Sequence, residues 1–257
     1  MNVRFLGAHN MESKETRPMS MLIDNILAID AGGLTSSLTF SEQAAIKALL
    51  VTHHHYDHIK DIPMLGMNFY VNNSQLPIYS IKSVYEALNY LFKYPGKLYL
   101  DFLKSPSDNP TLKFIPVVPL KPLTIEGYNI LAVLVKHSVP TVGYQITSPK
   151  GEILFYTGDT GSGLDNCWQQ ISPDLLAIEV TLPNEFIETA REAKHLTPCL
   201  LREELLSFQK IKGYLPKIIT VHMFPQHQGK IEIELKQIAA ELNATIMPGY
   251  EDMQINL

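Results

Sequence analysis

The chain has 257 residues, of which 46% are hydrophobic and 18% charged, so it is long enough to bury a substantial core in one domain. Its formal net charge of -5, without any run of lysines and arginines, argues against the surface of a general nucleic-acid-binding protein. We find no signal-like N-terminal segment and no stretch with the length of a membrane span. We therefore expect a cytoplasmic, single-domain protein (residues 1–257) that does not bind membranes.

Strands and helices are expected to alternate along the whole chain. Apolar and β-branched runs predict strands at residues 2–7, 21–30, 47–54, 112–119, 128–137, 143–148, 152–159, 174–181 and 217–223. Helical patterns, several opened by Ser or Thr, occupy residues 41–49, 56–71, 82–94, 197–211 and 229–243. Residues 66–110 carry no recognisable chemistry, and we expect them to form a packed helical insertion; a substrate lid is the alternative.

Four of the nine histidines fall between His53 and His58, directly after an apolar run that ends at Thr52. Imidazoles and a carboxylate suit zinc, iron or manganese, and a turn after a rigid strand lets alternate side chains converge on neighbouring metals. The alternatives are a surface histidine cluster, the remnant of a purification tag, or one mononuclear structural site. The internal position, after a strand that we expect to be buried, argues against a tag.

Three further candidates follow other expected strands. His137 comes after NILAVLVK, Asp159 after EILFYTG, and His222 after KIITV. Each of them alone is a weak signal, because a single histidine or a turn aspartate usually has an ordinary structural role. Together with the histidine cluster they form a pattern that is repeated at four strand ends.

This set of residues closely resembles the signature of the metallo-β-lactamase fold superfamily, a His-x-His-x-Asp-His run followed by a later His, Asp and His. The resemblance implies an α+β fold, a four-layer αββα sandwich with two divalent metal ions at one sheet edge. It implies that Asp159 bridges the ions, that His54 and Tyr56 are not ligands, and that each ion has three further ligands: His53, His55 and His137 for one, and Asp57, His58 and His222 for the other. Zinc is the expected metal, with manganese or iron as alternatives.

The segment LLAIEVTLPNEFIETAREAKHLTP resembles ribonuclease Z and class II cyclic-nucleotide phosphodiesterases, in which a Glu-x-Thr strand end is followed by a further histidine. The matching residues are Glu179, Thr181 and His195. By this resemblance His195 lies beside the scissile phosphate, where it would stabilise the transition state or protonate the leaving oxygen. The alternative is a surface histidine at a helix N-terminus.

The N-terminal segment is also similar to that of ribonuclease Z and class II cyclic-nucleotide phosphodiesterases, in which a serine precedes the second strand; Ser20 occupies this place. The usual Gly-rich stretch after Leu-Gly is replaced here by AHNMES. This change introduces His9, which we expect to be a loop residue and not an eighth ligand. The chain also lacks the long basic insertion with which ribonuclease Z holds tRNA. We therefore expect a small-molecule phosphodiester as the substrate, and not tRNA or long nucleic acid.

The leading hypothesis is a phosphodiesterase that cleaves a small phosphodiester or cyclic nucleotide with a hydroxide bridging the two metals, with Asp57 and His195 as catalytic residues. A thioester or lactone hydrolase would use the same hydroxide and would not need His195. A non-hydrolytic diiron sensor is an alternative of another class. The oligomeric state stays open, a homodimer being one option.

Overall fold

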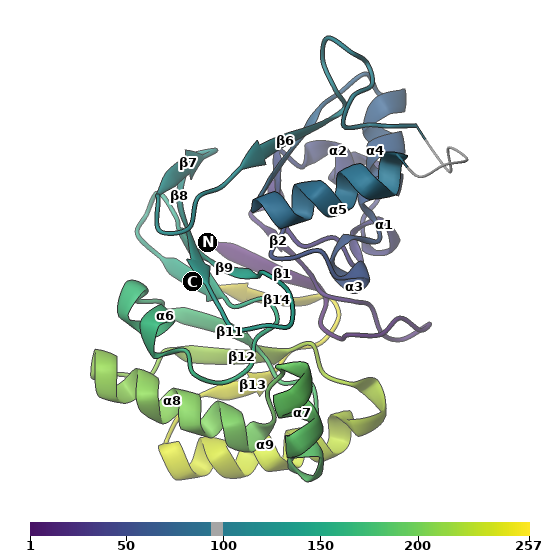
Figure 1. Ribbon diagram of the computed structural model, residues 1–257. Helices are drawn as coiled ribbons and strands as arrows, with labels where there is room; N and C mark the ends of the chain where they lie inside the picture. Colours follow the sequence, from purple (N-terminus) through teal and green to yellow (C-terminus); the bar gives the residue numbers. More distant parts are fainter. Residues whose placement is uncertain (94–99) are drawn as a thin grey trace.

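The structure is a computed structural model, described for residues 1–93 and 100–257. In this part of the chain two seven-stranded sheets lie face to face (Figure 1). The strands of the first sheet follow the order β14 (Met253–Asn256), β1 (Asn2–Gly7), β2 (Ser20–Ile23), β3 (Leu27–Ile29), β4 (Ala48–Leu50), β5 (Leu76–Ser80) and β6 (Leu112–Pro116). Pairing is antiparallel from β14 to β3 and parallel from β3 to β6.

The second sheet brings together strands from the C-terminal half. Its order is β13 (Ile246–Pro248), β12 (Lys217–Val221), β11 (Leu175–Glu179), β10 (Ile153–Tyr156), β9 (Val142–Thr147), β8 (Tyr128–Leu134) and β7 (Leu123–Ile125). Strands β10 to β13 are parallel, and β7 to β10 pair antiparallel. Strands β8, β10, β11 and β12 therefore point in the same direction, so that the residues following them emerge at one edge.

Two hydrophobic cores result from the alternation of side chains along the strands. In β10 the side chains of Leu154 and Tyr156 belong to the core that includes the facing sheet, whereas Phe155 packs with Trp168 against the outer helices. Successive side chains of a strand point to opposite faces, so a strand between two layers must be apolar on both. This explains the continuous apolar runs of the sequence.

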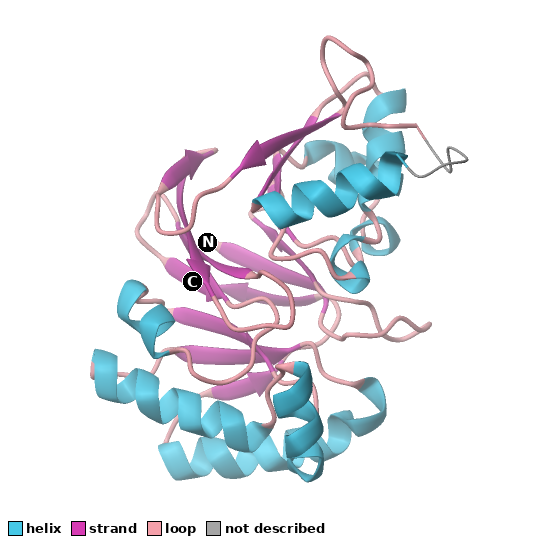
Figure 2. Ribbon diagram, in the orientation of Figure 1, coloured by secondary structure: helices cyan, strands magenta, loops and turns pink. Residues whose placement is uncertain are grey.

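Helices cover both outer faces (Figure 2), which confirms the expected four-layer αββα sandwich. The first sheet carries α1 (Leu34–Ser37), α2 (Phe40–Ala45), α3 (Tyr56–Ile59), α4 (Ile62–Val71) and α5 (Lys82–Lys93). The second carries α6 (Asp165–Gln170), α7 (Ile187–Ala193), α8 (Pro198–Lys212) and α9 (Gln228–Leu242), and short 3-10 turns, η1 (Asn184–Phe186) and η2 (Pro225–His227), precede α7 and α9. In the described residues no helix is long and apolar enough to cross a membrane.

Helix α8 shows how the sequence sets the limits of a helix. The hydroxyl oxygen of Thr197 accepts a hydrogen bond from the main-chain N–H of Leu200, and Pro198 occupies the first turn. The helix ends at Gly213, whose φ of 80° lies in the left-handed region. Threonine, proline and glycine therefore define this helix, whose two ends each lie one residue later than those of the expected interval 197–211.

The expectation of a helical insertion at residues 66–110 is wrong in part. The stretch contains α5 and most of α4, but it also contains β5, which pairs in parallel with both β4 and β6 inside the first sheet. This strand is only five residues long and includes a proline, Pro77, so its local pattern is weak. The sheet decides its conformation, and residues 94–99 lie outside the described part of the chain.

Candidate metal centre

Seven histidine and aspartate side chains converge where strand ends of both sheets meet. The potential ligand atoms form two groups, each with all members within 4.8 Å of one another: His53, His55, His137 and Asp159, and Asp57, His58, Asp159 and His222. These are the seven residues singled out in the sequence, and Asp159 belongs to both groups. His54 and Tyr56 belong to no such group in the described structure, and the Tyr56 side chain is exposed.

Asp30 orients the imidazoles on the side of the first sheet. Its carboxylate accepts hydrogen bonds from Nδ1 of His58 at 2.8 Å and from Oγ1 of Thr52 at 2.9 Å. The same Thr52 oxygen lies 3.0 Å from Nδ1 of His53 and accepts the proton of that nitrogen. Asp30 is completely buried, so His53 and His58 are both held with Nδ1 protonated and Nε2 available to a metal.

The second sheet orients its histidines in the same way. Nδ1 of His222 lies 2.9 Å from Oγ1 of Thr181, which in turn donates to Glu179 at 2.7 Å. Nδ1 of His137 donates to the main-chain carbonyl of Lys194 at 3.1 Å. Both rings therefore present Nε2 to the centre.

Buried polar atoms without partners show that these residues suit metal ions. In the described structure Nε2 of His53 is buried and has no hydrogen-bond partner, and Nε2 of His58 and Oδ1 of Asp159 are buried 3.2 Å apart without hydrogen-bond geometry, which is costly unless a ligand satisfies these atoms. Nδ1 of His55 lies 3.1 Å from Nε2 of His137. Nitrogens that share one tetrahedral zinc ion at about 2.0–2.1 Å would be separated by about 3.3 Å, so the spacing fits. The buried cluster is consistent with a dimetal site.

The carboxylates of the centre are held in their ionised form. Burial opposes the charge of Asp57, but the adjacent His58 and His222 lower the pKa of this carboxyl group to about 2. Asp159 is buried more deeply, and His222 and His58 still hold its pKa well below the usual range. Burial and the neighbouring His137 lower the pKa of His55 to about 4, which favours the neutral imidazole that binds metals.

Three of the ten non-glycine residues with a positive φ in the described structure lie at the centre. Asp30, Lys194 and His222 have φ angles of 54°, 58° and 62°, in the left-handed region that non-glycine residues rarely adopt. Such conformations persist only where the surrounding structure enforces them, and they concentrate at functional sites. Gly158, directly before Asp159, also has a positive φ, and a Cβ there would lie 2.9 Å from the Thr52 side chain. Only glycine permits this contact.

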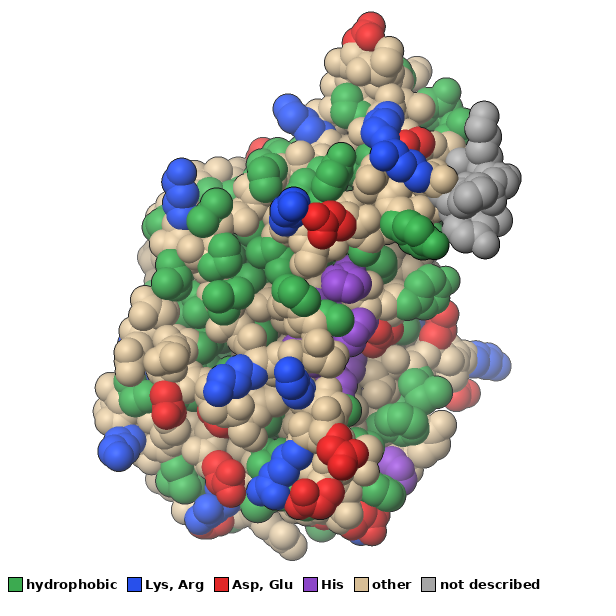
Figure 3. All heavy atoms as spheres, viewed as in Figure 1, with side chains coloured by type: hydrophobic (Ala, Val, Ile, Leu, Met, Phe, Trp, Pro, Cys, Tyr) green, Lys and Arg blue, Asp and Glu red, His purple; other side chains and the backbone are tan. Residues whose placement is uncertain are grey.

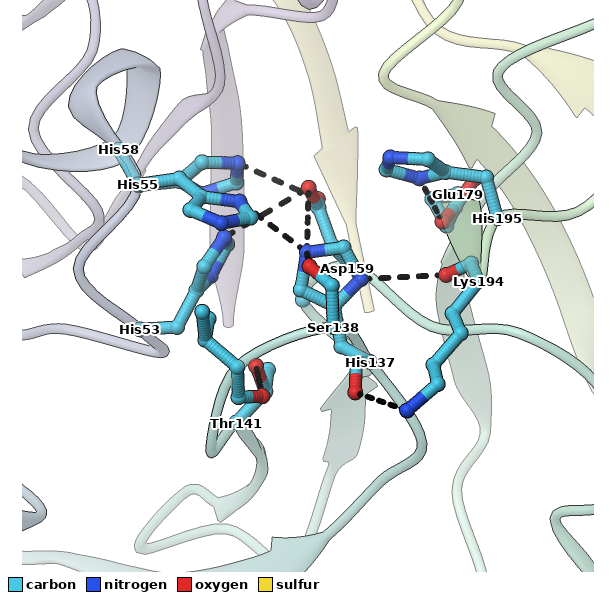
Figure 4. A network of polar contacts seen from close by, with 12 residues as sticks. His53, His55, His58, His137, Ser138, Thr141, Asp159, Glu179, Lys194 and His195 are labelled. Carbon is cyan, nitrogen blue, oxygen red and sulfur yellow. Dashed lines mark hydrogen bonds and ion pairs between the residues drawn. The ribbon is translucent and has the colours of Figure 1, made fainter. Parts of the chain in front are cut away.

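His195 lies at the rim of the cluster, on the far side of Asp159 from His53, His55 and His58 in Figure 4. Its Nδ1 donates to Glu179 at 2.6 Å, and its ring stacks on that of His222 with centroids 5.5 Å apart. Burial favours the neutral ring, but the Glu179 carboxylate outweighs it and raises the pKa of His195 to about 9. The side chain is 17% exposed, so a cationic imidazole reaches the solvent beside the cluster.

Sequence reasoning missed Asp30 and Lys194, and it did not foresee the burial of His9. Asp30 ends the strand of the IDAG segment, the same signal that identified the other residues, whereas the role of Lys194 depends on its main chain and leaves no trace in the sequence. His9 lies in the loop between β1 and β2, as expected, and belongs to no candidate metal group of the described residues, but it is only 2% exposed and lies between Glu251 at 2.6 Å and Gln228 at 2.9 Å.

Comparison with known proteins agrees with this geometry. The sequence model of the "Beta-lactamase superfamily domain" matches residues 22–223. The chain belongs to this superfamily. The match includes the seven converging residues, and with the buried histidine and aspartate cluster it makes the protein a metal-dependent hydrolase of the metallo-β-lactamase fold. No curated protein sequence matches the chain.

Solved structures show the same metallo-β-lactamase fold at low sequence identity. The chain is similar to unliganded yeast PDE1, with a TM-score of 0.83 and 15% identity, covering 100% of this chain and 99% of that one. The metallo-β-lactamase fold protein YhfI from Bacillus subtilis has a TM-score of 0.77 and 19% sequence identity, and the match covers 99% of this chain and 98% of that one. The short form of human tRNase Z has a TM-score of 0.69 and 18% sequence identity, and the match covers 100% of this chain and 99% of that one. These likenesses show the fold alone.

A cavity of about 630 Å³ opens beside the metal centre of this superfamily member. His137 and His195 line it, together with the loop after β8 and the ends of α7 and α8. In Figure 3 histidine side chains are visible in a hollow of the surface, with Lys and Arg side chains close by. Pockets of roughly 300–1,000 Å³ accommodate small molecules, so this one has room for a substrate next to the cluster.

Proposed function

We propose that this hydrolase cleaves a small phosphodiester, such as a cyclic nucleotide, at the P–O bond. The observation that carries the proposal is the position of His195, a cationic imidazole held by Glu179 between the metal centre and the cavity. A phosphodiester develops negative charge on its oxygens during cleavage, and its leaving oxygen needs a proton. A thioester has a thiolate leaving group, which is stable without a proton, so its hydrolysis depends less on such a donor.

In this proposal His53, His55 and His137 would hold one divalent cation, Asp57, His58 and His222 would hold the other, and Asp159, which belongs to both groups, would serve both. Bound there, two cations would lower the pKa of water towards neutrality and neutralise charge on the phosphoryl oxygens. Zinc is the metal we expect, and manganese and iron suit the same nitrogen and oxygen donors.

Asp57 and His195 complete the chemistry, and both lie beside His222. Asp57 is ionised and its side chain is 28% exposed, so it can accept a hydrogen bond from the attacking water and orient it. His195 donates its Nε2 proton to the leaving oxygen, since Nδ1 is committed to Glu179. Water and the diester thus become a phosphomonoester and an alcohol, and solvent returns the proton to His195.

The dimensions of the cavity favour a small substrate over a long nucleic acid. Its volume of about 630 Å³ corresponds to one small molecule, and the chain carries a formal charge of -5. A polyanion would need an extended basic surface to offset repulsion. We therefore propose a diffusible phosphodiester as the substrate.

The test compares two substrates in wild-type protein and in His195→Ala, each with zinc and then manganese supplied. We expect turnover of a cyclic nucleotide, whose alkoxide leaving group needs a proton, to fall by about 10²–10⁴-fold in the variant, and turnover of p-nitrophenyl acetate to change little. An undiminished phosphodiesterase rate would refute the role of His195. Activity of the wild type on the acetate alone would favour a carbonyl substrate instead.

A further inference from the structure

The cavity beside the metal centre has a positively charged wall. Its lining includes Lys136, Arg191 and Lys194, and the described lining residues include a single acidic side chain, Glu203. The chain as a whole is acidic, with a net charge of -5, so this local excess of positive charge runs against the average composition.

We propose that this wall binds a second anionic group of the substrate, so that the preferred phosphodiester carries an additional phosphate away from the bond that is cleaved. This inference rests on the proposed function and specifies its substrate class. The metal centre would hold the reacting phosphate, and the lysines would hold the other one.

Two of the cations are not neutralised by the protein. In the described structure neither Lys136 nor Lys194 has a carboxylate within 4.0 Å, and Nζ of Lys194 bonds instead to the neutral main-chain carbonyl of His137 at 3.2 Å. Arg191 is different, because it pairs with Glu188 at 2.9 Å. The lysine ammonium groups therefore keep their charge available for an anion.

The position of Lys136 links this wall to a second cavity. A Cβ on Gly163 would lie 2.5 Å from Nζ of Lys136, so the ammonium group lies over this glycine. Gly163 lines a neighbouring cavity of about 420 Å³, whose wall includes Leu120, Val133 and Leu164. Lys136 lines both cavities, so a phosphate bound to it can belong to a molecule whose apolar body lies on the neighbouring wall.

Binding of a remote phosphate is expected to affect KM more than kcat, because the contact is the same in the ground state and the transition state. Its strength is limited, since the lysine side chains are in contact with solvent. We expect an advantage of about fivefold in kcat/KM for a substrate with the second phosphate.

The test uses thymidine 5′-(4-nitrophenyl phosphate) with and without a 3′-phosphate, two substrates that share the reacting group. The 3′-phosphate should raise kcat/KM about fivefold in wild-type protein and in Lys210→Gln, a change at an exposed lysine of α8. Lys136→Gln should remove most of the preference. Glu203→Gln should increase it, because it removes the opposing charge from the same wall.

A binding measurement separates this proposal from the proposed function. Isothermal titration calorimetry of the zinc-loaded protein would compare thymidine 3′,5′-bisphosphate with thymidine 5′-monophosphate. If the bisphosphate binds more tightly and Lys136→Gln loses this preference, the anion site is supported, even if neither nitrophenyl ester is hydrolysed. Absence of hydrolysis would refute only the phosphodiesterase. Equal affinities, or a preference that survives Lys136→Gln, would overturn the anion site while leaving the phosphodiesterase in place.

Discussion

Lys194 and His137 are joined by two hydrogen bonds of opposite direction. Nδ1 of His137 donates to the main-chain carbonyl of Lys194 at 3.1 Å, and Nζ of Lys194 donates to the carbonyl of His137 at 3.2 Å (Figure 4). The first bond exists because Lys194 adopts a φ of 58° at the end of α7. The backbone of one residue thus fixes the tautomer and the orientation of another that faces the metal centre.

This relationship predicts different results for two substitutions of Lys194. Lys194→Gly permits the same φ and keeps the carbonyl in place, so the metal content should equal that of wild-type protein. Lys194→Pro cannot adopt a positive φ, so the carbonyl must move and the metal content should fall. Elemental analysis after dialysis would measure both, with the melting temperature as a check on folding. Equal metal loss in the two variants would contradict the explanation.

Asp30 offers a second test of indirect control over the metals. Both oxygens of Asp30 accept hydrogen bonds, from the main-chain N–H and the hydroxyl of Thr52 and from Nδ1 of His58. Asp30→Asn replaces one of these oxygens with an NH₂ group, which cannot accept them. We expect metal affinity to fall about 10–100-fold, as for other residues that orient metal-binding histidines. Competition with a chelator would measure the affinity, and Asp108→Asn, in an exposed loop, serves as the control. Unchanged affinity in Asp30→Asn would contradict the prediction.

Asp57→Ala is expected to abolish hydrolysis. The substitution removes both a proposed ligand and the ionised carboxylate that would orient water, whose pKa of about 2 keeps it charged at neutral pH. Turnover of bis(p-nitrophenyl) phosphate and the metal content of the purified variant would be measured together. Wild-type activity in Asp57→Ala would refute its assigned role.

The raised pKa of His195 predicts how activity depends on pH. His195 must be protonated to donate a proton, so activity should persist below about pH 9 and fall as the pH rises through that value. Because Glu179 raises this pKa, Glu179→Gln should move the falling limb of the kcat profile to lower pH. A limb at the same pH in Glu179→Gln would show that another group titrates.

Metal removal should destabilise the fold as well as stop the reaction. A ligand present at about 1,000 times its Kd stabilises the folded state by about 4.1 kcal/mol. In a domain of this size that corresponds to a Tm change of roughly 8–16 °C. Calorimetry before and after chelation would measure the change, and zinc addition should restore Tm. An unchanged Tm would contradict a centre that binds metal tightly.

The residues of the metal centre could be found in the sequence because strand ends place them. A run of histidines after one strand, and His137, Asp159 and His222 after three others, are visible without any structure. Parallel strands bring their ends to one edge, so local patterns were enough to indicate a metal cluster, whereas the sandwich around it was implied by the resemblance to the superfamily signature. The short strand β5 was missed because its neighbours in the sheet, and not its own pattern, make it a strand.

The sequence by itself determined which residues converge, and its resemblance to the superfamily signature added the type of fold and the exclusion of His54 and Tyr56. Only the tertiary structure decided the burial of His9, the hydrogen bonds from Asp30, and the left-handed backbone of Lys194 that fixes His137. The cationic wall, too, combines Lys136 with Lys194, which are distant in sequence. Periodicity reports which face of a strand or helix is buried, whereas these contacts join residues 20 to more than 200 positions apart, and they form only when the two sheets pack.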